Sequence, residues 1–203
     1  MDIFDHIDAE LLRIGEIAPA GYLLALRVRG TAPLMAFKTY PQAWIDRYME
    51  QGYLLRDPIT TWAMTIGGTI RWSSPFLLDP FRILRQAAAH GLTYGASVAH
   101  GSLGALTICS AGRSDREMTD EEIARLRQIV VDLHNRTELP KSLTESQKAV
   151  LRAMAQGDSP RQAADRIGVS EAHARASFKE LCACLYAQSP AEAVQRARDY
   201  KLL

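Results

Sequence analysis

YPQAWIDRYMEQGYLLRDPITTWAMTIGGTIRW, residues 40–72, combines aromatic side chains at helical spacing with two prolines at expected helix starts. Proline suits the first turn of a helix, so we expect a helix over 41–51. Side chains four residues apart share one face of a helix. Trp44 and Tyr48 therefore lie together on that helix, and Tyr40 stands just before it.

A carboxylate and a further aromatic residue complete this stretch. Asp57 precedes Pro58, so its side chain is expected to cap a second helix. With Trp72, the aromatic residues and the carboxylate could line an apolar pocket that has a few fixed hydrogen bonds. The same pattern also fits aromatic residues packed in a core and an aspartate that only caps a helix. Both interpretations stay open on these residues alone.

Helix and strand patterns alternate on both sides of this stretch. Ile3, Ile7, Leu11 and Ile14 form one apolar stripe of a helix, and apolar residues recur at steps of three and four after Met118. The alternation predicts an α+β fold, an α/β/α sandwich around an antiparallel sheet, in residues 1–137. The other expected elements are helices from Asp79-Pro80 to 90–91 and over 118–137, and strands over 21–30, 34–39, 92–100 and 102–110.

A linker over residues 138–142, centred on Pro140, is expected to lead into a small all-α domain at 143–203. The starts of its helices are marked by hydroxyl residues followed three positions later by Gln or Glu, the capping-box pattern. These pairs are Thr144 with Gln147, Ser159 with Gln162, and Ser189 with Glu192, and Ser170 is a further cap. The expected helices are 145–156, 160–166, 171–184 and 190–199.

RQAADRIGVSEAHARASFKEL, residues 161–181, has the form of a helix-turn-helix. Ala164 is small enough for two helices to cross closely, and Gly168 suits the left-handed turn between them. The second helix would enter the DNA major groove. Its expected DNA-contacting residues are Ala172, Arg175, Ala176 and Lys179. Acidic residues on the same helix weaken its electrostatic attraction to DNA phosphates. The alternative is a helical bundle that binds protein.

Composition excludes several classes of protein. The 203 residues are 47% hydrophobic and 23% charged with a net charge of +1, which is typical of a globular protein. No apolar run reaches the ~18 residues of a membrane span, and the N-terminal residues are acidic where a targeting peptide would be basic. The 3 cysteines form no disulfide framework, and the 5 histidines form no triad or metal motif. We expect a cytoplasmic protein with no catalytic site, metal, cofactor or membrane partner.

Motifs in both halves resemble those of LuxR-type quorum-sensing transcription factors. The autoinducer-binding domain of that family has motifs similar to three stretches of this chain. These are YPQAW with the aromatic and acidic residues after it, AAAHGLTYGAS and GSLGALTICS. The start of the four-helix DNA-binding domain of that family resembles residues 143–170 of this chain, LTESQKAVLRAMAQGDSPRQAADRIGVS. The matched segments span most of the chain in the family's domain order.

The resemblance implies a pocket for an N-acyl homoserine lactone. Trp44 would donate to the lactone carbonyl, Asp57 would accept the amide N–H, and Tyr40 would hydrogen-bond the acyl carbonyl. Thr107 would add a hydroxyl to the same carbonyl. The walls of the implied pocket would be Tyr48 and Trp72. The implied partners are a small autoinducer, double-stranded DNA, and a second copy or a related regulator in a dimer.

Departures from the family leave alternatives open. Trp62 stands on the helix that borders the implied pocket, and an inward orientation would shorten the acyl channel. The recognition helix lacks several customary contact residues, since His173, Ala174 and Ser177 occupy their positions. The leading hypothesis is a lactone-responsive regulator that binds DNA. The alternatives are an anti-activator that inhibits a related regulator by forming heterodimers, and a pocket that binds another molecule or none.

Overall fold

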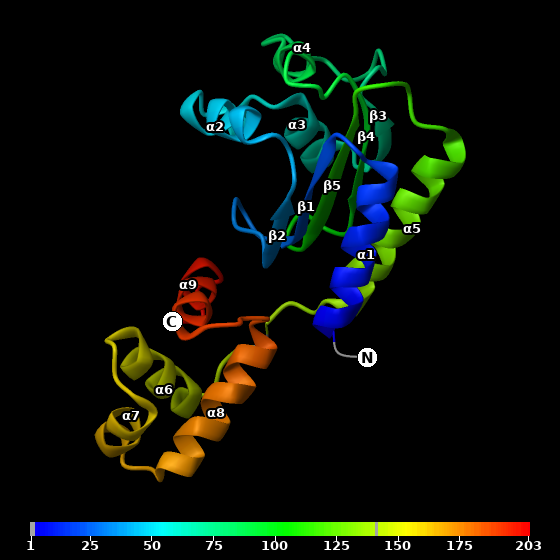
Figure 1. Ribbon diagram of the computed structural model, residues 1–203. Helices are drawn as coiled ribbons and strands as arrows, with labels where there is room; N and C mark the ends of the chain where they lie inside the picture. Colours follow the sequence, from blue (N-terminus) through cyan, green and yellow to red (C-terminus); the bar gives the residue numbers. More distant parts are fainter. Residues whose placement is uncertain (1–2, 141) are drawn as a thin grey trace. The chain divides into compact units, whose positions relative to one another are not determined.

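The computed structural model describes residues 3–140 and 142–203, which divide into two compact units, Met1–Glu138 and Leu139–Leu203. The expected linker over 138–142 includes Lys141, which lies outside the described residues. The first unit has an α+β fold around one antiparallel sheet with the strand order β2-β1-β5-β4-β3 (Figure 1). The strands are β1 (Gly21–Val28), β2 (Met35–Lys38), β3 (Gly68–Arg71), β4 (Tyr94–His100) and β5 (Leu106–Arg113).

Helices cover both faces of this sheet. The helices α1 (Ile3–Ile17) and α5 (Asp120–Arg136) run side by side along one face (Figure 1). Apolar residues of the predicted stripe bury their side chains there, among them Ile7 and Ile14. The other face carries α2 (Gln42–Glu50), the 3-10 turn η1 (Tyr53–Leu55), α3 (Pro58–Thr65) and α4 (Ile83–Ala88).

Strand β5 shows how the sheet separates its two sides. Successive side chains of a strand point to opposite faces. Thr107 is fully buried and hydrogen-bonded to His134 of α5, with 2.9 Å between Oγ1 and Nδ1. Ile108 and Ser110 therefore point to the face that α2 and α3 cover.

A β-bulge interrupts the alternation in β1, where the register with β5 shifts between Ala25 and Val28. Arg27 has a φ of 51°, a left-handed conformation that is uncommon for a residue with a side chain. Its backbone N–H donates to Thr107 Oγ1 at 3.2 Å, and its guanidinium donates to the backbone oxygen of His134 at 2.5 Å. The extra residue lets both Ala25 and Val28 face the α2–α3 side.

Two features of the first unit differ from the sequence prediction. The prediction missed β3, a four-residue edge strand that pairs only with β4 in the described sheet. The helix predicted after Asp79-Pro80 is present as α4, but its predicted start at Pro80 was wrong, because α4 begins at Ile83. Asp79 still caps it, since its two carboxylate oxygens accept from the N–H groups of Ile83 and Leu84 at 2.8 Å each. The cap acts from further away because Arg82, with a φ of 54°, turns the chain between them.

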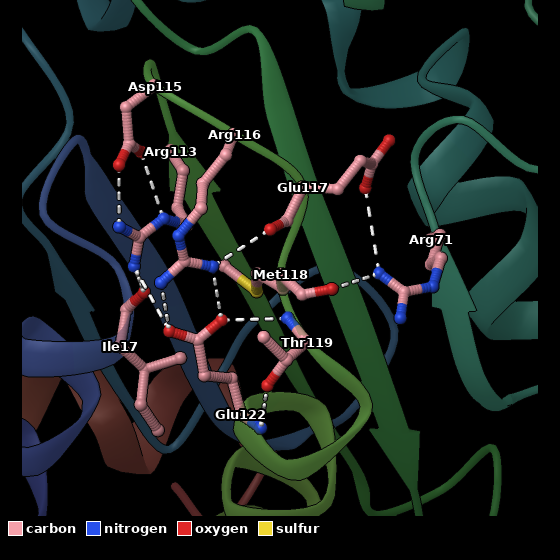
Figure 2. Close-up of polar contacts among 9 residues, drawn as sticks. All are labelled: Ile17, Arg71, Arg113, Asp115, Arg116, Glu117, Met118, Thr119 and Glu122. Atoms are coloured by element: carbon pink, nitrogen blue, oxygen red, sulfur yellow. Dashed lines mark hydrogen bonds and ion pairs between the residues drawn. The ribbon is translucent and has the colours of Figure 1, made fainter.

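Charged residues fix the connection from β5 into α5 (Figure 2). Arg113 at the end of β5 donates to the backbone oxygen of Ile17 at 3.1 Å and to Glu122 at 3.3 Å. Arg116 donates to both carboxylate oxygens of Glu122, at 2.8 and 2.9 Å. Thr119 and Glu122 form a capping box at the start of α5. The connection thus ties the ends of α1 and β5 to the first turn of α5.

The second unit contains four helices in its described residues. All four predicted N-caps accept the backbone hydrogen bond expected of them, and two of the three predicted capping boxes, Thr144–Gln147 and Ser159–Gln162, are complete. Ser189 accepts from the N–H of Glu192, but the carboxylate of Glu192 accepts from Gln188, so this box is incomplete. The helices are α6 (Glu145–Ala155), α7 (Pro160–Ile167), α8 (Glu171–Cys184) and α9 (Pro190–Asp199).

The charge network predicts an acid-sensitive stability. Hydrogen bonds from Arg116 hold the pKa of Glu122 at about 2, below its ordinary 4.5. A lowered pKa adds stability that is present above pH 4.5 and is lost as the pH falls towards 2. Wild type should therefore exceed Glu122→Gln in free energy of unfolding by about 1–3 kcal/mol at pH 6, and the gap should close at acidic pH. Urea denaturation across this range measures it.

Glu50→Gln, at the exposed last residue of α2, is the matched control and should show a smaller gap at pH 6 than Glu122→Gln. A gap for Glu122→Gln that is independent of pH would contradict the role given to Arg116.

Candidate ligand-binding site

A cavity of about 370 Å³ lies between the sheet and the helices of the α2–α3 side. Its floor comes from β1, β2 and β5, and its roof from α2, η1, α3 and α4. Most of the lining is apolar, as in small-molecule sites that place a few polar groups in an apolar surface. Five of the six residues predicted to bind a ligand line this cavity: Tyr40, Trp44, Tyr48, Asp57 and Trp72.

Asp57, the N-cap of α3, is the charged group of the roof. Its Oδ1 accepts the N–H of Ile59 at 2.8 Å, so it caps α3 as the sequence predicts. Its Oδ2 accepts the hydroxyl of Tyr48, which reaches across from α2 at 2.7 Å. A carboxylate has about four lone-pair sites, so these two bonds leave capacity for a further donor in the cavity.

Burial changes the ionisation of the polar groups that face the cavity. Desolvation raises the pKa of Asp57 above 3.8, against the lowering effect of the bonds from Tyr48 and Ile59. Desolvation also raises the pKa values of Tyr40 and Tyr48 above the ordinary value of a phenol, and the Asp57 charge adds to both shifts. The two tyrosines therefore keep their hydroxyl protons and act as hydrogen-bond donors at neutral pH.

Tyr40 and Trp44 link the first helix of the roof to the floor. The hydroxyl of Tyr40 donates to the backbone oxygen of Ser110 in β5 at 2.6 Å. Trp44 is buried and contacts the ring of Tyr48 edge to face, with 5.9 Å between ring centroids. A third ring, Tyr53 of η1, lies 5.7 Å from that of Tyr48. The helical spacing of the aromatic residues thus produces both a packed ring cluster and part of the cavity wall.

Trp72 lies flat against the sheet because two strands carry glycine beneath it. A Cβ at Gly95 would meet the indole of Trp72 at 2.5 Å, and one at Gly112 would meet it at 3.3 Å. The indole N–H donates to Ser97 Oγ at 2.9 Å, and Ser97 Oγ is 2.8 Å from Ser110 Oγ. Trp72 is therefore held by a buried hydrogen-bond chain as well as by packing.

The prediction that Thr107 faces the ligand was wrong. Thr107 points to the opposite face of the sheet, where its hydroxyl contacts His134 and accepts from Arg27. Ser110, three residues later on the same strand, lines the cavity in its place. The strand alternation from Ile108 could have identified Ser110, because both residues share one face.

Further residues of interest have clear positions. Trp62 is buried in the core and is not among the lining residues, so it does not shorten the cavity. Ile83 and Leu84, at the start of α4, do line it. Desolvation lowers the pKa of His134 to about 4, so this buried imidazole is neutral at physiological pH.

One cluster in the described residues has potential metal-ligand atoms, those of His6, Glu10 and Asp132, within 4.8 Å of one another. His6 Nε2 is 2.6 Å from Asp132 Oδ2. Arg136 donates to both oxygens of Asp132 at 2.9 Å, and Arg13 donates to Glu10. Since each carboxylate already has an arginine partner, the cluster acts as an ion-pair network that joins α1 to α5.

The residues predicted to contact DNA lie on the exposed side of α8. Ala172, Arg175, Ala176 and Lys179 are all exposed there. Arg175, however, donates to Glu171 Oε1 from both Nε, at 3.0 Å, and Nη2, at 2.6 Å. One of the two cations on this side is thus paired within its own helix.

Comparison with known proteins identifies the family of the chain. Residues 17–137, more than half of the sequence, match the family described as "Autoinducer binding domain". The chain belongs to the autoinducer-binding domain family. The matched region contains every cavity residue named above, and autoinducer-binding domains of this kind are those of LuxR-type quorum-sensing regulators. A chain of this family is not an enzyme.

Individual relatives agree with this placement. The autoinducer-binding chain is 27% identical over 183 residues to transcriptional activator protein VanR of Vibrio anguillarum. The aligned region covers 82% of this chain and 76% of that protein. It is 26% identical over 117 residues to regulatory protein SdiA of Escherichia coli (strain K12), 54% and 49% of the two chains. A structure of SdiA in complex with octanoyl-rac-glycerol has the same fold, with a TM-score of 0.53, 20% identity, and coverage of 98% of this chain and 88% of that one.

No helix in the described part of this autoinducer-binding chain has both the length and the apolar character needed to cross a bilayer.

The position of Trp72 yields a mutational prediction. Gly95→Ala should lower the free energy of unfolding by about 1–3 kcal/mol, because the added methyl group overlaps both the indole and the backbone oxygen of Ala111. The displaced indole should also change the near-ultraviolet circular dichroism spectrum. Gly104→Ala is the matched control, since a Cβ there meets nothing within 4 Å. Equal stability of the two variants would contradict this packing.

Proposed function

We propose that this regulator binds an N-acyl homoserine lactone in the cavity and responds to it by binding DNA as a dimer in the cytoplasm. The observation that carries the proposal is the convergence of Tyr40, Trp44 and Asp57 on one apolar cavity. Their hydrogen-bonding groups include two donors, a hydroxyl and an indole N–H, and one charged acceptor. An amide with two carbonyl groups, such as an acyl homoserine lactone, has the complementary set.

Each polar group has a proposed role in this complex. Asp57 accepts the amide N–H of the ligand, a charge-assisted bond that is stronger than a neutral one. The indole of Trp44 donates to the lactone carbonyl, and the hydroxyl of Tyr40 moves from the backbone of Ser110 to the acyl carbonyl. Tyr48 and Trp72 form walls, and Tyr48 also holds Asp57 in place at 2.7 Å.

The apolar lining suits the acyl part of the ligand. A volume of about 370 Å³ lies within the usual range of roughly 300–1,000 Å³ for small-molecule sites. Each buried methylene group contributes about 0.8 kcal/mol. The SdiA structure with octanoyl-rac-glycerol supports an acylated ligand for a protein of this fold. Binding would stabilise the folded first unit by mass action, which couples the signal to the amount of active regulator.

This assignment predicts the effect of Asp57→Asn. Asparagine still caps α3, but it offers one carbonyl oxygen where Tyr48, Ile59 and the ligand amide each supply a donor. The dissociation constant for a lactone should rise about 10–100-fold, which corresponds to roughly 1.5–3 kcal/mol. Lactone-induced shifts in melting temperature, over a series of acyl chain lengths, measure this change.

The control is Asp46→Asn, an exposed carboxylate of α2 that accepts from Gln42. It should leave the lactone response unchanged. The proposed role of Asp57 would be rejected if Asp57→Asn kept the affinity of wild type.

A helix-turn-helix in the second unit would give the protein its DNA-binding function. Gly168 ends α7 in the left-handed conformation, with a φ of 72°, and Ser170 caps α8 immediately afterwards. Ala164 and Ala174 are buried, as a close helix contact requires. Exposed Arg175 and Lys179 would contact bases and phosphates. In a homodimer, two such helices would read half-sites about one DNA turn apart.

The pairing of Arg175 with Glu171 favours a second candidate function. A DNA reader gains affinity from cations that neutralise phosphates, and this ion pair reduces that contribution. An anti-activator would need the dimer contacts of a LuxR-type regulator but little DNA affinity. It would form heterodimers with a related regulator and lower the DNA binding of that partner.

The two candidates differ in the effect of Glu171→Gln. If α8 contacts DNA, releasing Arg175 and removing a negative charge should raise DNA affinity by about tenfold at low salt. Gel shifts with DNA from the upstream region of the gene, with and without lactone, measure the change. Glu180→Gln, on the same helix, is the control for charge alone and should give a smaller gain. Absence of binding in every case, with inhibition of a co-expressed LuxR-type regulator, would establish the anti-activator.

A further inference from the structure

We propose that the acyl tail of the ligand leaves the cavity at the β2 edge of the sheet, so that long unbranched acyl chains bind without an upper length limit. The proposal rests on the proposed function, because it concerns the tail of the ligand whose polar head that function places at Asp57. It assigns the specificity for chain length to the exit rather than to an end wall.

The floor of the cavity leads to this edge. Two cross-strand rows line it, and each crosses from β5 through β1 to β2. The first row is Ser110, Leu23 and Lys38, and the second is Ile108, Ala25 and Ala36. With about 4.8 Å between neighbouring strands, each row spans roughly 10 Å. Since β2 is the last strand of the sheet, the floor ends there, and no further strand among the described residues closes it.

Exposure increases along both rows. Ser110 is buried, Leu23 is half-buried and Lys38 is exposed. In the second row Ile108 and Ala25 are half-buried, and Ala36 is exposed. All of these residues line the same cavity, so the cavity is closed beneath its polar groups and open at β2.

The roof also combines buried and exposed side chains. Trp44 and Ile59 are buried, whereas Met49, Leu55 and Met64 line the cavity with exposed fractions of 69%, 84% and 39%. Exposed apolar side chains of this size are costly to leave in water unless something covers them. An alkyl chain that leaves the cavity past these side chains would cover part of their apolar surface.

The side chain at the end of the first row permits the exit of a tail. Lys38 can lay its methylene stem along an apolar chain and keep its ammonium group in water. Ala36, at the end of the second row, is too small to block the opening. Trp62, the one bulky residue expected to shorten the channel, is buried elsewhere in the core.

The expected affinity follows from this geometry. Each methylene inside the cavity should lower the dissociation constant by about fourfold. Beyond the edge of the sheet each methylene should lower it by less, because one side of the chain faces water. The dissociation constant should therefore fall steeply at first and then level off, without rising again for longer chains.

The test is a titration of the full-length protein with N-acyl homoserine lactones of 4 to 16 acyl carbons, below their critical micelle concentrations, followed by tryptophan fluorescence. A parallel series of 1-acylglycerols of the same lengths lacks the lactone and amide. A falling and then level dissociation constant in either series supports the exit at β2. A rise of tenfold or more beyond an intermediate length would overturn it, and so would an absence of binding in both series.

The two series separate the proposals. If acylglycerols show the expected trend and no lactone binds, the lactone assignment fails while the exit stands. If lactones bind with a sharp upper limit, the proposed function stands while the exit fails.

A variant at the exit sharpens the test. Ala36→Trp places an indole across the opening of the edge strand, where an aromatic residue is well tolerated. It should weaken binding of 12- and 16-carbon ligands at least tenfold and change that of 4- and 6-carbon ligands less than twofold. Ala43→Trp, at an exposed position of α2 outside the cavity lining, is the matched control and should change neither. Equal weakening of all chain lengths by Ala36→Trp would contradict an exit at this position.

Discussion

A carboxylate taken out of water needs hydrogen-bond partners, and the first unit depends on how Asp57 obtains them. One oxygen is satisfied by the start of α3 and the other by a phenol from α2. The same side chain therefore fixes the angle between two roof helices and presents a negative charge to the cavity. Desolvation raises the pKa of Asp57 because it disfavours the charged carboxylate. An occupant that donates a hydrogen bond to this carboxylate therefore stabilises its charged form. The carboxylate of Asp57 therefore serves both the packing of the roof helices and the binding of an occupant.

The floor depends on the opposite property, the absence of side chains. Gly95 and Gly112 leave a flat patch on which Trp72 lies, and Ser97 beneath it receives the indole N–H. Packing density in a protein interior leaves no room to insert a methyl group without displacement. The breadth of the cavity at this end is thus set by backbone and indole rather than by flexible side chains. A rigid floor and hydrogen-bonded roof position the polar groups before any ligand arrives.

Much of the fold follows from local sequence signals, and the failures have local causes. Helix starts were predictable where a capping residue directly precedes the helix, as at Asp57 and Ser170, since the hydrogen bond involves only neighbouring residues. The start of α4 was not, because left-handed Arg82 separates Asp79 from the helix. Strand β3 is too short to show alternation. The five cavity residues came from a resemblance combined with helical spacing, whereas Thr107 was misplaced because its face depends on the register of a strand that the sequence does not fix.

The true contacts of Thr107 point to the bulge it supports. By accepting the N–H of Arg27, its hydroxyl keeps one surplus residue in β1 and leaves both Ala25 and Val28 facing the cavity. Removal of that residue from the chain would return the strand to strict two-residue alternation with Val28 still opposite Leu106 and on the cavity face. The bulge therefore lets the first strand vary in length by one backbone unit while the lining of the chamber and every polar anchor stay unaltered.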